Sequence, residues 1–98
     1  MLIADIDGLK KINQAHGQTA GDQVLKHFAN ILQRNLRQVD IAGKFGSDEF
    51  MIILPQTDLD GGYILAKRFK KLLKENPLTH AGSNISYTAS IGVTAFDE

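Results

Sequence analysis

Two short acidic segments carry the side chains best suited to chemistry in this chain. The segment Asp5-Ile6-Asp7 closes the first apolar run, and the segment Gly46-Ser47-Asp48-Glu49-Phe50 holds two adjacent carboxylates on a turn. Strand-like residues flank that turn on both sides, so we expect a β-hairpin with the acidic pair at its tip. Carboxylate oxygens select hard cations such as magnesium, manganese or calcium over zinc. If the fold brings the two segments together, they form one divalent-cation site.

The hydrophobic pattern predicts the elements that must position these carboxylates. An unbroken apolar run predicts a buried first strand over 1–6. Turn formers between two strand-like segments predict a hairpin over 40–45 and 49–54, and clean alternation predicts a last strand over 85–95. Apolar residues at helical spacing predict one short and two long helices, over 9–14, about 21–36 and 59–75. Thr57-Asp58 is expected to cap the last helix, and residues 77–84 are expected to form a loop.

The resulting order, β-α-β-β-α-β, predicts an α+β fold of the ferredoxin-like class, in which a central antiparallel sheet has helices on one face. In that topology the first and third strands are adjacent and antiparallel, so the end of one lies beside the start of the other. Asp5 and Asp7 should therefore approach Asp48 and Glu49. Two separated segments that converge in this way indicate a site more strongly than either segment alone.

A site of this kind suits phosphate chemistry. Magnesium held by carboxylates completes its shell with water and phosphate oxygens, and two metals can activate a hydroxyl and stabilise a leaving pyrophosphate. Gly8 allows close backbone approach, and the amides of residues 8–10 open a predicted helix. The residues thus predict a metal-dependent nucleotidyl-transfer or nucleotide-binding site. The structural alternative makes Asp7 a helix N-cap and Gly46-Ser47-Asp48 ordinary turn chemistry.

Composition narrows the classes of function. The 98 residues suffice for a single core, and eleven basic residues balance eleven acidic ones, which gives no indication of nucleic-acid or membrane binding. The lack of cysteine excludes disulfides and thiolate metal sites and fits a cytoplasmic location. No apolar run approaches the roughly 20 residues of a membrane span. We expect one domain over 1–98, cut from a larger, multidomain regulatory protein.

Four segments of the sequence resemble the GGDEF family, the diguanylate cyclases. Residues 46–50 resemble the family's signature loop, with Ser47 in place of its second glycine, and residues 5–13 resemble its first-strand motif. Residues 16–22 resemble the loop that follows, and residues 89–94 resemble the last core strand. The resemblance covers essentially the whole chain, in order and with the family's spacing. It implies the fold that nucleotide cyclases share with polymerase palms.

The resemblance implies a role for each acidic residue. Asp5 and Asp48 would hold two Mg²⁺ or Mn²⁺ ions per half-site, assisted by the Ile6 carbonyl, and Glu49 would lie in the same coordination shell. The Asp48 carboxylate would also help to deprotonate the ribose 3′-hydroxyl of the substrate.

The implied substrate is GTP. Asn13 and Asp22 would bind the guanine edge, because its N1–H and N2–H₂ donors need acceptors that disfavour adenine. The backbone of Gly8 and Leu9 would contact the terminal phosphates. In the family two domains face each other, each bringing one GTP, and form cyclic di-GMP and pyrophosphate. The implied partner is thus a second copy, because a monomer has half an active site.

The segment Arg37-Gln38-Val39-Asp40 resembles the family's inhibitory RxxD site, at the expected distance before the signature loop. There the arginine binds the guanine or phosphate of the product, and the aspartate binds its guanine edge. Arg68, on the next predicted helix, is a candidate second arginine. The structural alternatives are an i,i+3 ion pair, worth roughly a few tenths of a kcal/mol, and a solvated lysine-rich helix face around Arg68.

The sequence departs from the family pattern at Ser47 and at its ends. If Ser47 must adopt a positive φ, it costs on the order of 1 kcal/mol. The helix that precedes the first strand in the family lies outside the sequence. So does the later segment that places a lysine and an arginine on the β- and γ-phosphates.

Two functions stay open at this point. The first is an active diguanylate cyclase with product inhibition, and it is favoured because the metal and guanine residues are intact. The second is a catalytically silent module that binds GTP or cyclic di-GMP and regulates a partner. A third, a class III nucleotide cyclase or polymerase-palm relative, is disfavoured by Asn13 together with Asp22.

Overall fold

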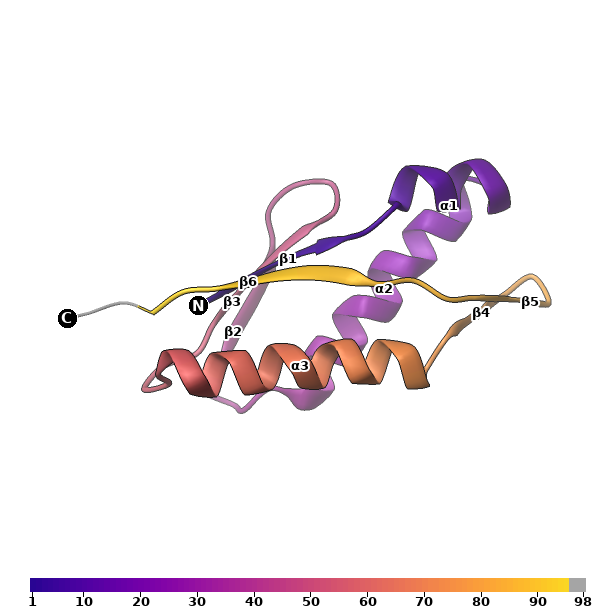
Figure 1. Cartoon of the computed structure of the whole chain (residues 1–98). Helices are drawn as coiled ribbons and strands as arrows, with labels where there is room; N and C mark the ends of the chain where they lie inside the picture. Colours follow the sequence, from indigo (N-terminus) through magenta and orange to yellow (C-terminus); the bar gives the residue numbers. More distant parts are fainter. Residues whose placement is uncertain (96–98) are drawn as a thin grey trace.

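A four-stranded antiparallel sheet forms the centre of the computed structural model, which describes residues 1–95. Across the sheet the order is β2 (Ile41–Lys44), β3 (Glu49–Ile53), β1 (Leu2–Ile6) and β6 (Ala89–Val93). β1 therefore lies between β3 and β6, and every neighbouring pair is antiparallel (Figure 1). The predicted α+β, ferredoxin-like arrangement is confirmed.

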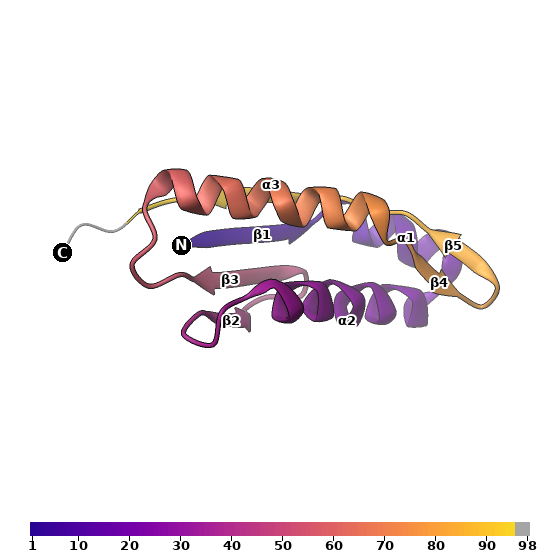
Figure 2. The same cartoon turned by 90° about the horizontal axis from the view of Figure 1, so that it is seen from below.

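The described residues also form three helices: α1 (Leu9–His16), α2 (Gln18–Asn35) and α3 (Leu59–Glu75). Figures 1 and 2 show the two long helices, α2 and α3, covering one face of the sheet. α3 begins where expected, because the Asp58 carboxylate accepts a hydrogen bond of 2.8 Å from the Gly61 N–H. No helix within residues 1–95 is long and apolar enough to cross a lipid bilayer.

The core lies between the sheet and the two long helices. Alternate residues of β1, namely Leu2, Ala4 and Ile6, are buried there, whereas Ile3 is 36% exposed and Asp5 is exposed. The predicted burial of the first strand therefore holds for one face of β1 only, because α2 and α3 cover only that face. The largest fully buried side chains are Phe28, Phe69, Leu2, Leu32, Ile52 and Val24.

Three predicted boundaries also differ from the structure. Residues 77–84, predicted as loop, contain a small hairpin of β4 (Leu78–His80) and β5 (Ser83–Ile85). The last sheet strand starts only at Ala89, although the alternation continues through residues 85–88. α2 starts at Gln18, directly after Gly17, which has a φ of 93°.

Candidate active site

The ends of β1 and β3 bring three carboxylates together. Asp5 lies opposite Glu49 in the ladder between the two strands, and the Ile6 N–H donates to the Asp48 carbonyl at 3.1 Å. Asp5, Asp48 and Glu49 each offer an oxygen atom, and these atoms lie within 4.8 Å of one another. We call these three residues the acidic cluster. The predicted convergence of the two acidic segments is thus present for three of their four carboxylates.

Asp7 is the carboxylate that does not join the acidic cluster. It accepts hydrogen bonds from the Thr88 hydroxyl at 2.8 Å and from the Ser90 hydroxyl at 2.7 Å, and its N–H donates to the Thr88 carbonyl at 2.9 Å. The alternative role of Asp7 as a helix cap is also wrong, because the N-cap of α1 is Gly8 and no side chain caps it. Asp7 instead joins the end of β1 to the start of β6.

Gly8 makes the turn from β1 into α1. Its φ of 66° and ψ of 27° lie in the left-handed region, which glycine occupies without strain. A Cβ added at Gly8 would meet no atom within 4 Å, so the space above its backbone is open. Gly8 and Leu9 therefore present an accessible turn at the helix N-terminus, next to the acidic cluster.

A cleft of about 450 Å³ opens beside the acidic cluster. We call it the nucleobase pocket, after the guanine that the family resemblance predicts for it. α1 and α2 contribute Asn13 and Asp22 to its wall, and the hairpin contributes Lys44, Ser47 and Asp48. The Oδ1 atom of Asn13 is buried and has no hydrogen-bond partner among the described residues. The structure thus brings the two predicted guanine-binding residues to one cleft, and Asp48 belongs both to that cleft and to the acidic cluster.

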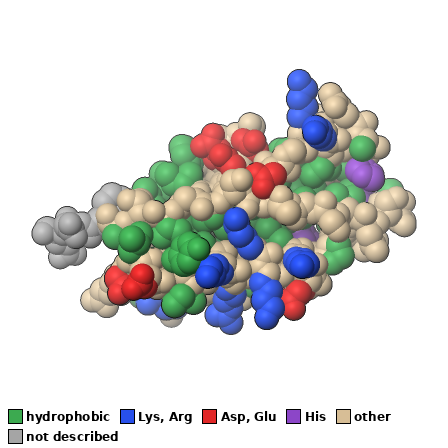
Figure 3. Space-filling model, in the orientation of Figure 1, with side chains coloured by type: hydrophobic (Ala, Val, Ile, Leu, Met, Phe, Trp, Pro, Cys, Tyr) green, Lys and Arg blue, Asp and Glu red, His purple; other side chains and the backbone are tan. Residues whose placement is uncertain are grey.

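A larger hollow, of about 670 Å³, includes Asp7 in its lining. It runs between α3 and the residues around β6, and its lining includes Lys70, Lys74, Tyr87 and Thr88. Of these two hollows, the nucleobase pocket is the one lined both by Asn13 and by Asp48 of the acidic cluster. In Figure 3, Lys and Arg side chains gather along α3 on the visible face, as expected for a solvated helix face.

Ser47 sits in the hairpin without backbone strain. Only Gln56 and Ala81 among the described non-glycine residues have a positive φ, so the strain cost considered for Ser47 does not arise. The positive φ of this loop belongs to Gly46, at 137°. Because residues with a side chain rarely adopt that φ, glycine suits the first position of the loop, and serine fits the second.

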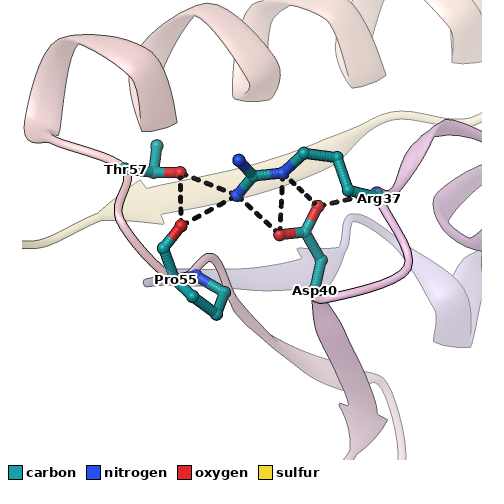
Figure 4. A network of polar contacts seen from close by, with 4 residues as sticks. All are labelled: Arg37, Asp40, Pro55 and Thr57. Atoms are coloured by element: carbon teal, nitrogen blue, oxygen red, sulfur yellow. Dashed lines mark hydrogen bonds and ion pairs between the residues drawn. The ribbon is translucent and has the colours of Figure 1, made fainter.

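The Arg37–Asp40 pair forms a closed polar network (Figure 4). The Arg37 Nη2 atom donates to Asp40 Oδ1 at 2.8 Å, to the Pro55 carbonyl at 2.9 Å and to the Thr57 hydroxyl at 3.0 Å. The Arg37 side chain is 55% exposed, whereas the Asp40 side chain is 2% exposed. The side-chain hydrogen bond from Arg37 lowers the pKa of Asp40 and, reciprocally, raises the pKa of Arg37.

This network joins the loop before β2 to the loop before α3. The predicted structural alternative, an i,i+3 ion pair, is therefore present. Arg68 is an exposed residue of α3, and it is not among the partners of Arg37 in the described part of the chain.

Several residues around the site were not singled out from the sequence. Lys44 and Gln18 line the nucleobase pocket, Gly21 lies against Asn13, and Thr88 and Ser90 hold Asp7. Thr88 and Ser90 could have been found from the alternation of residues 85–95, because both lie on its polar face and carry hydroxyls. The places of Gln18 and Gly21 depend on how α1 packs against α2, and the place of Lys44 depends on the hairpin of β2 and β3; residue spacing reveals neither.

Comparisons with known proteins agree with this geometry. The family model described as "Diguanylate cyclase, GGDEF domain" matches residues 1–98. Diguanylate cyclase DgcP of Pseudomonas aeruginosa is 40% identical over 97 residues, which are 99% of this chain and 14% of the relative. Cyclic di-GMP phosphodiesterase NbdA of the same species is 32% identical over 96 residues, which are 98% of this chain and 12% of that relative.

The fold has close counterparts among solved structures. The diguanylate cyclase SiaD from Pseudomonas aeruginosa, crystallised with its activator SiaC, superposes with a TM-score of 0.87 at 32% identity. The match covers 94% of this chain and 35% of that one, so the chain spans only part of the proteins that it resembles. Family model, relatives and fold agree, and the chain belongs to the GGDEF family of diguanylate cyclase domains.

Proposed function

We propose that this domain is a diguanylate cyclase, which joins two GTP molecules into cyclic di-GMP and releases two pyrophosphates. One observation carries the proposal: the acidic cluster and the nucleobase pocket share Asp48. A guanine in that pocket would leave its triphosphate within reach of the carboxylates. The family membership supports the same reaction, because the relative DgcP bears the name of a diguanylate cyclase.

The acidic cluster fits a magnesium or manganese site. Its three carboxylates offer oxygens within 4.8 Å of one another, and a set of oxygen donors suits a hard cation. Asp5, Asp48 and Glu49, assisted by the Ile6 carbonyl, would hold two ions in each half-site. Bound there, the ions would neutralise charge on the triphosphate and on the leaving pyrophosphate.

Asn13 and Asp22 would provide the specificity for guanine. Guanine presents N1–H and N2–H₂ donors on one edge, and a carboxylate with an amide oxygen can accept from them. The unpartnered Oδ1 of Asn13 supports this role, because a buried polar atom without a partner is costly in a folded protein. The N–H groups of Gly8 and Leu9, at the N-terminus of α1, would donate to the terminal phosphates.

The reaction would take place between two copies of the domain, because one nucleobase pocket holds one GTP. The 3′-oxygen of each GTP attacks the α-phosphorus of the other, a new P–O bond forms, and the bond to the pyrophosphate oxygen breaks. The Asp48 carboxylate accepts the proton of the attacking hydroxyl. Two such transfers close the ring of cyclic di-GMP.

The test is GTP turnover with magnesium, with the products separated by chromatography, on the full-length protein that contains this chain. The expected result is cyclic di-GMP and pyrophosphate in a ratio of one to two, with turnover stopped by a chelator and restored by magnesium. Turnover that persists after chelation would contradict the role of the acidic cluster.

Arg37 and Asp40 are proposed to form the product-inhibition site, with Arg68 as a second arginine. The exposure of the Arg37 guanidinium supports contact with a phosphate or guanine of cyclic di-GMP. Because the Asp40 carboxylate is engaged by Arg37, the product must open this pair before it can reach Asp40. Inhibition should therefore be sensitive to both residues.

The second candidate function is a silent module that binds GTP or cyclic di-GMP and regulates a partner. The likeness to NbdA favours this second function, because that relative is similar to nearly the whole of this chain and yet is named a phosphodiesterase and not a cyclase. Binding of cyclic di-GMP without any turnover of GTP by the full-length protein would establish this function instead.

A further inference from the structure

Gly21 lies in the first turn of α2, directly against the Asn13 side chain of α1. A Cβ built on Gly21 would lie 1.9 Å from Asn13 Oδ1, 2.7 Å from its Cγ and 2.9 Å from its Nδ2. Real Cβ atoms essentially never come within 3.0 Å of such neighbours. All three clashing atoms belong to the Asn13 amide, so any side chain at Gly21 would displace that amide.

The backbone does not explain the glycine. Gly21 is helical and lacks the positive φ that would require glycine, unlike Gly17 just before α2. Glycine is also the weakest helix former after proline, so helix stability alone favours alanine at this buried position. What Gly21 provides is space, and the Asn13 amide occupies it.

We propose that Gly21 is a specificity-determining residue, because the absence of a side chain there lets the Asn13 amide lie in the nucleobase pocket. Gly21 and Asn13 both line that pocket, and Asp22 follows Gly21 on α2. The start of α2 thus supplies the Asp22 carboxylate itself, and through Gly21 it leaves room for the Asn13 amide of α1. This inference rests on the proposed function of the pocket as a guanine site.

The consequence is a defined change in nucleotide preference. An alanine at position 21 would move the Asn13 amide, whereas Asp22 and the acidic cluster would keep their places. Guanine would lose one of its two polar partners, and the triphosphate would keep its contacts. The affinity for GTP should therefore fall while the affinity for ATP, which this pocket does not favour, stays nearly constant.

The experiment measures binding of GTP and ATP with magnesium to the full-length protein and to the variants G21A, N13A and N13A/G21A. We expect G21A and N13A each to weaken GTP binding by about tenfold, the value of one lost polar contact, and to leave ATP binding within about twofold. Because the clash needs the Asn13 amide, the double variant should bind GTP as weakly as N13A and no more weakly.

A matched control separates specificity from general damage. Gly62 of α3 is also a helical glycine, and a Cβ there would lie 2.9 Å from Val93 Cγ1, away from the pocket. G62A should lower the melting temperature but keep the ratio of GTP to ATP affinity. Side-chain amide signals of Asn13 in NMR spectra should shift in G21A and stay in place in G62A.

Two outcomes would overturn the inference, and they are distinguishable. If the unaltered protein prefers GTP and G21A keeps that preference, Gly21 has no role in specificity, although the proposed function stands. If the unaltered protein shows no preference for GTP over ATP, the pocket is not a guanine site and both conclusions fail.

Discussion

Asp48 connects the two chemical regions of this domain at the scale of a single residue. Its backbone carbonyl accepts the Ile6 N–H, which fixes the hairpin tip against the end of β1, and its carboxylate belongs to the acidic cluster. The same residue lines the nucleobase pocket. A nucleotide and a cation held here would therefore meet at one carboxylate.

Asp48→Ala should abolish GTP turnover, because it removes both a proposed cation ligand and the proposed proton acceptor. Loss of at least about a hundredfold in kcat is expected, measured by pyrophosphate release. Binding of cyclic di-GMP at Arg37 should persist, since that residue lies in a separate network. Asp60→Ala, an exposed carboxylate on α3, serves as the control and should retain turnover. Turnover by Asp48→Ala would rule out the proposed assignment.

Arg37→Ala should raise the concentration of cyclic di-GMP needed for half-inhibition by about tenfold or more, because a charge-assisted contact with the product is lost. Arg34→Ala, a change of the same kind on the last turn of α2, is the matched control and should leave inhibition unchanged. The measurement is the initial rate at increasing cyclic di-GMP. Equal inhibition of both variants would show that Arg37 and Asp40 form only a structural ion pair.

At the scale of elements, the end of β1 is held from both sides. The Ile6 N–H bonds to β3 through Asp48, and the Asp7 carboxylate bonds to the segment of β6 through Thr88 and Ser90. Between these anchors and α1 lies the left-handed Gly8, whose turn carries the proposed phosphate-binding amides. Asp7 thus anchors the turn to the segment of β6.

Asp7→Ala should lower the free energy of unfolding by roughly 1 kcal/mol, a modest value because both hydrogen bonds are exposed. It should also weaken GTP binding, since the Gly8 turn loses an anchor. Denaturant titration measures the first effect and calorimetric binding the second. Ser90→Ala, which removes one of the two bonds, should give about half the destabilisation. A loss as complete as that of Asp48→Ala would instead indicate that Asp7 is a cation ligand.

The sequence predicted the elements that position the site, because β1 and β3 are clear apolar runs and hydrophobic periodicity is strong in α2 and α3. It failed where local signals conflict. Residues 77–84 contain Pro77, Gly82 and Asn84, so turn chemistry concealed two strands of three residues each. Ile85 and Tyr87 continue the inward alternation although they lie outside β6, because burial alone keeps them facing the core.

The site itself was only partly readable from sequence. Asp5, Asp48 and Glu49 could be paired because strand order fixes which ends meet. Asp7 was grouped with them by proximity in sequence, but its hydroxyl partners lie more than eighty residues away along the chain. Contacts of this kind depend on the register of β6 against β1, which no local pattern specifies.

At the scale of the whole molecule, a partly buried pair, His27 and Tyr87, ties α2 to the segment before β6. The Tyr87 hydroxyl lies 2.5 Å from His27 Nδ1, and the two rings meet edge to face with centroids 5.5 Å apart. Burial raises the pKa of Tyr87 and lowers the pKa of His27 from its usual value of 6.5, with the Arg34 charge adding to the second effect. The folded protein therefore favours the neutral form of His27.

Stability should fall as the pH drops through 6.5, the value expected for His27 in the unfolded chain. As the pH falls, His27 takes up a proton in the unfolded chain before it does so in the folded protein, because its pKa is lower in the folded protein. The contribution of neutral His27 to the free energy of unfolding is therefore fully present above pH 6.5 and is lost as the pH falls below it. Denaturant midpoints between pH 8 and 5 measure the effect. His27→Gln should flatten the profile in this range. An unchanged profile would show that protonation of His27 is not coupled to folding.

The proposed reaction needs two copies of the molecule, because each copy would carry one GTP and half of the active site. The most direct measurement is the initial rate of cyclic di-GMP formation from GTP and magnesium, with the full-length protein held monomeric by dilution and then paired by a fused dimerising coiled coil. The rate should rise with the square of the monomer concentration, and it should become proportional to the protein concentration once the copies are paired. A product formed at equal specific rate by isolated monomers, or no cyclic di-GMP from the paired full-length protein, would contradict it.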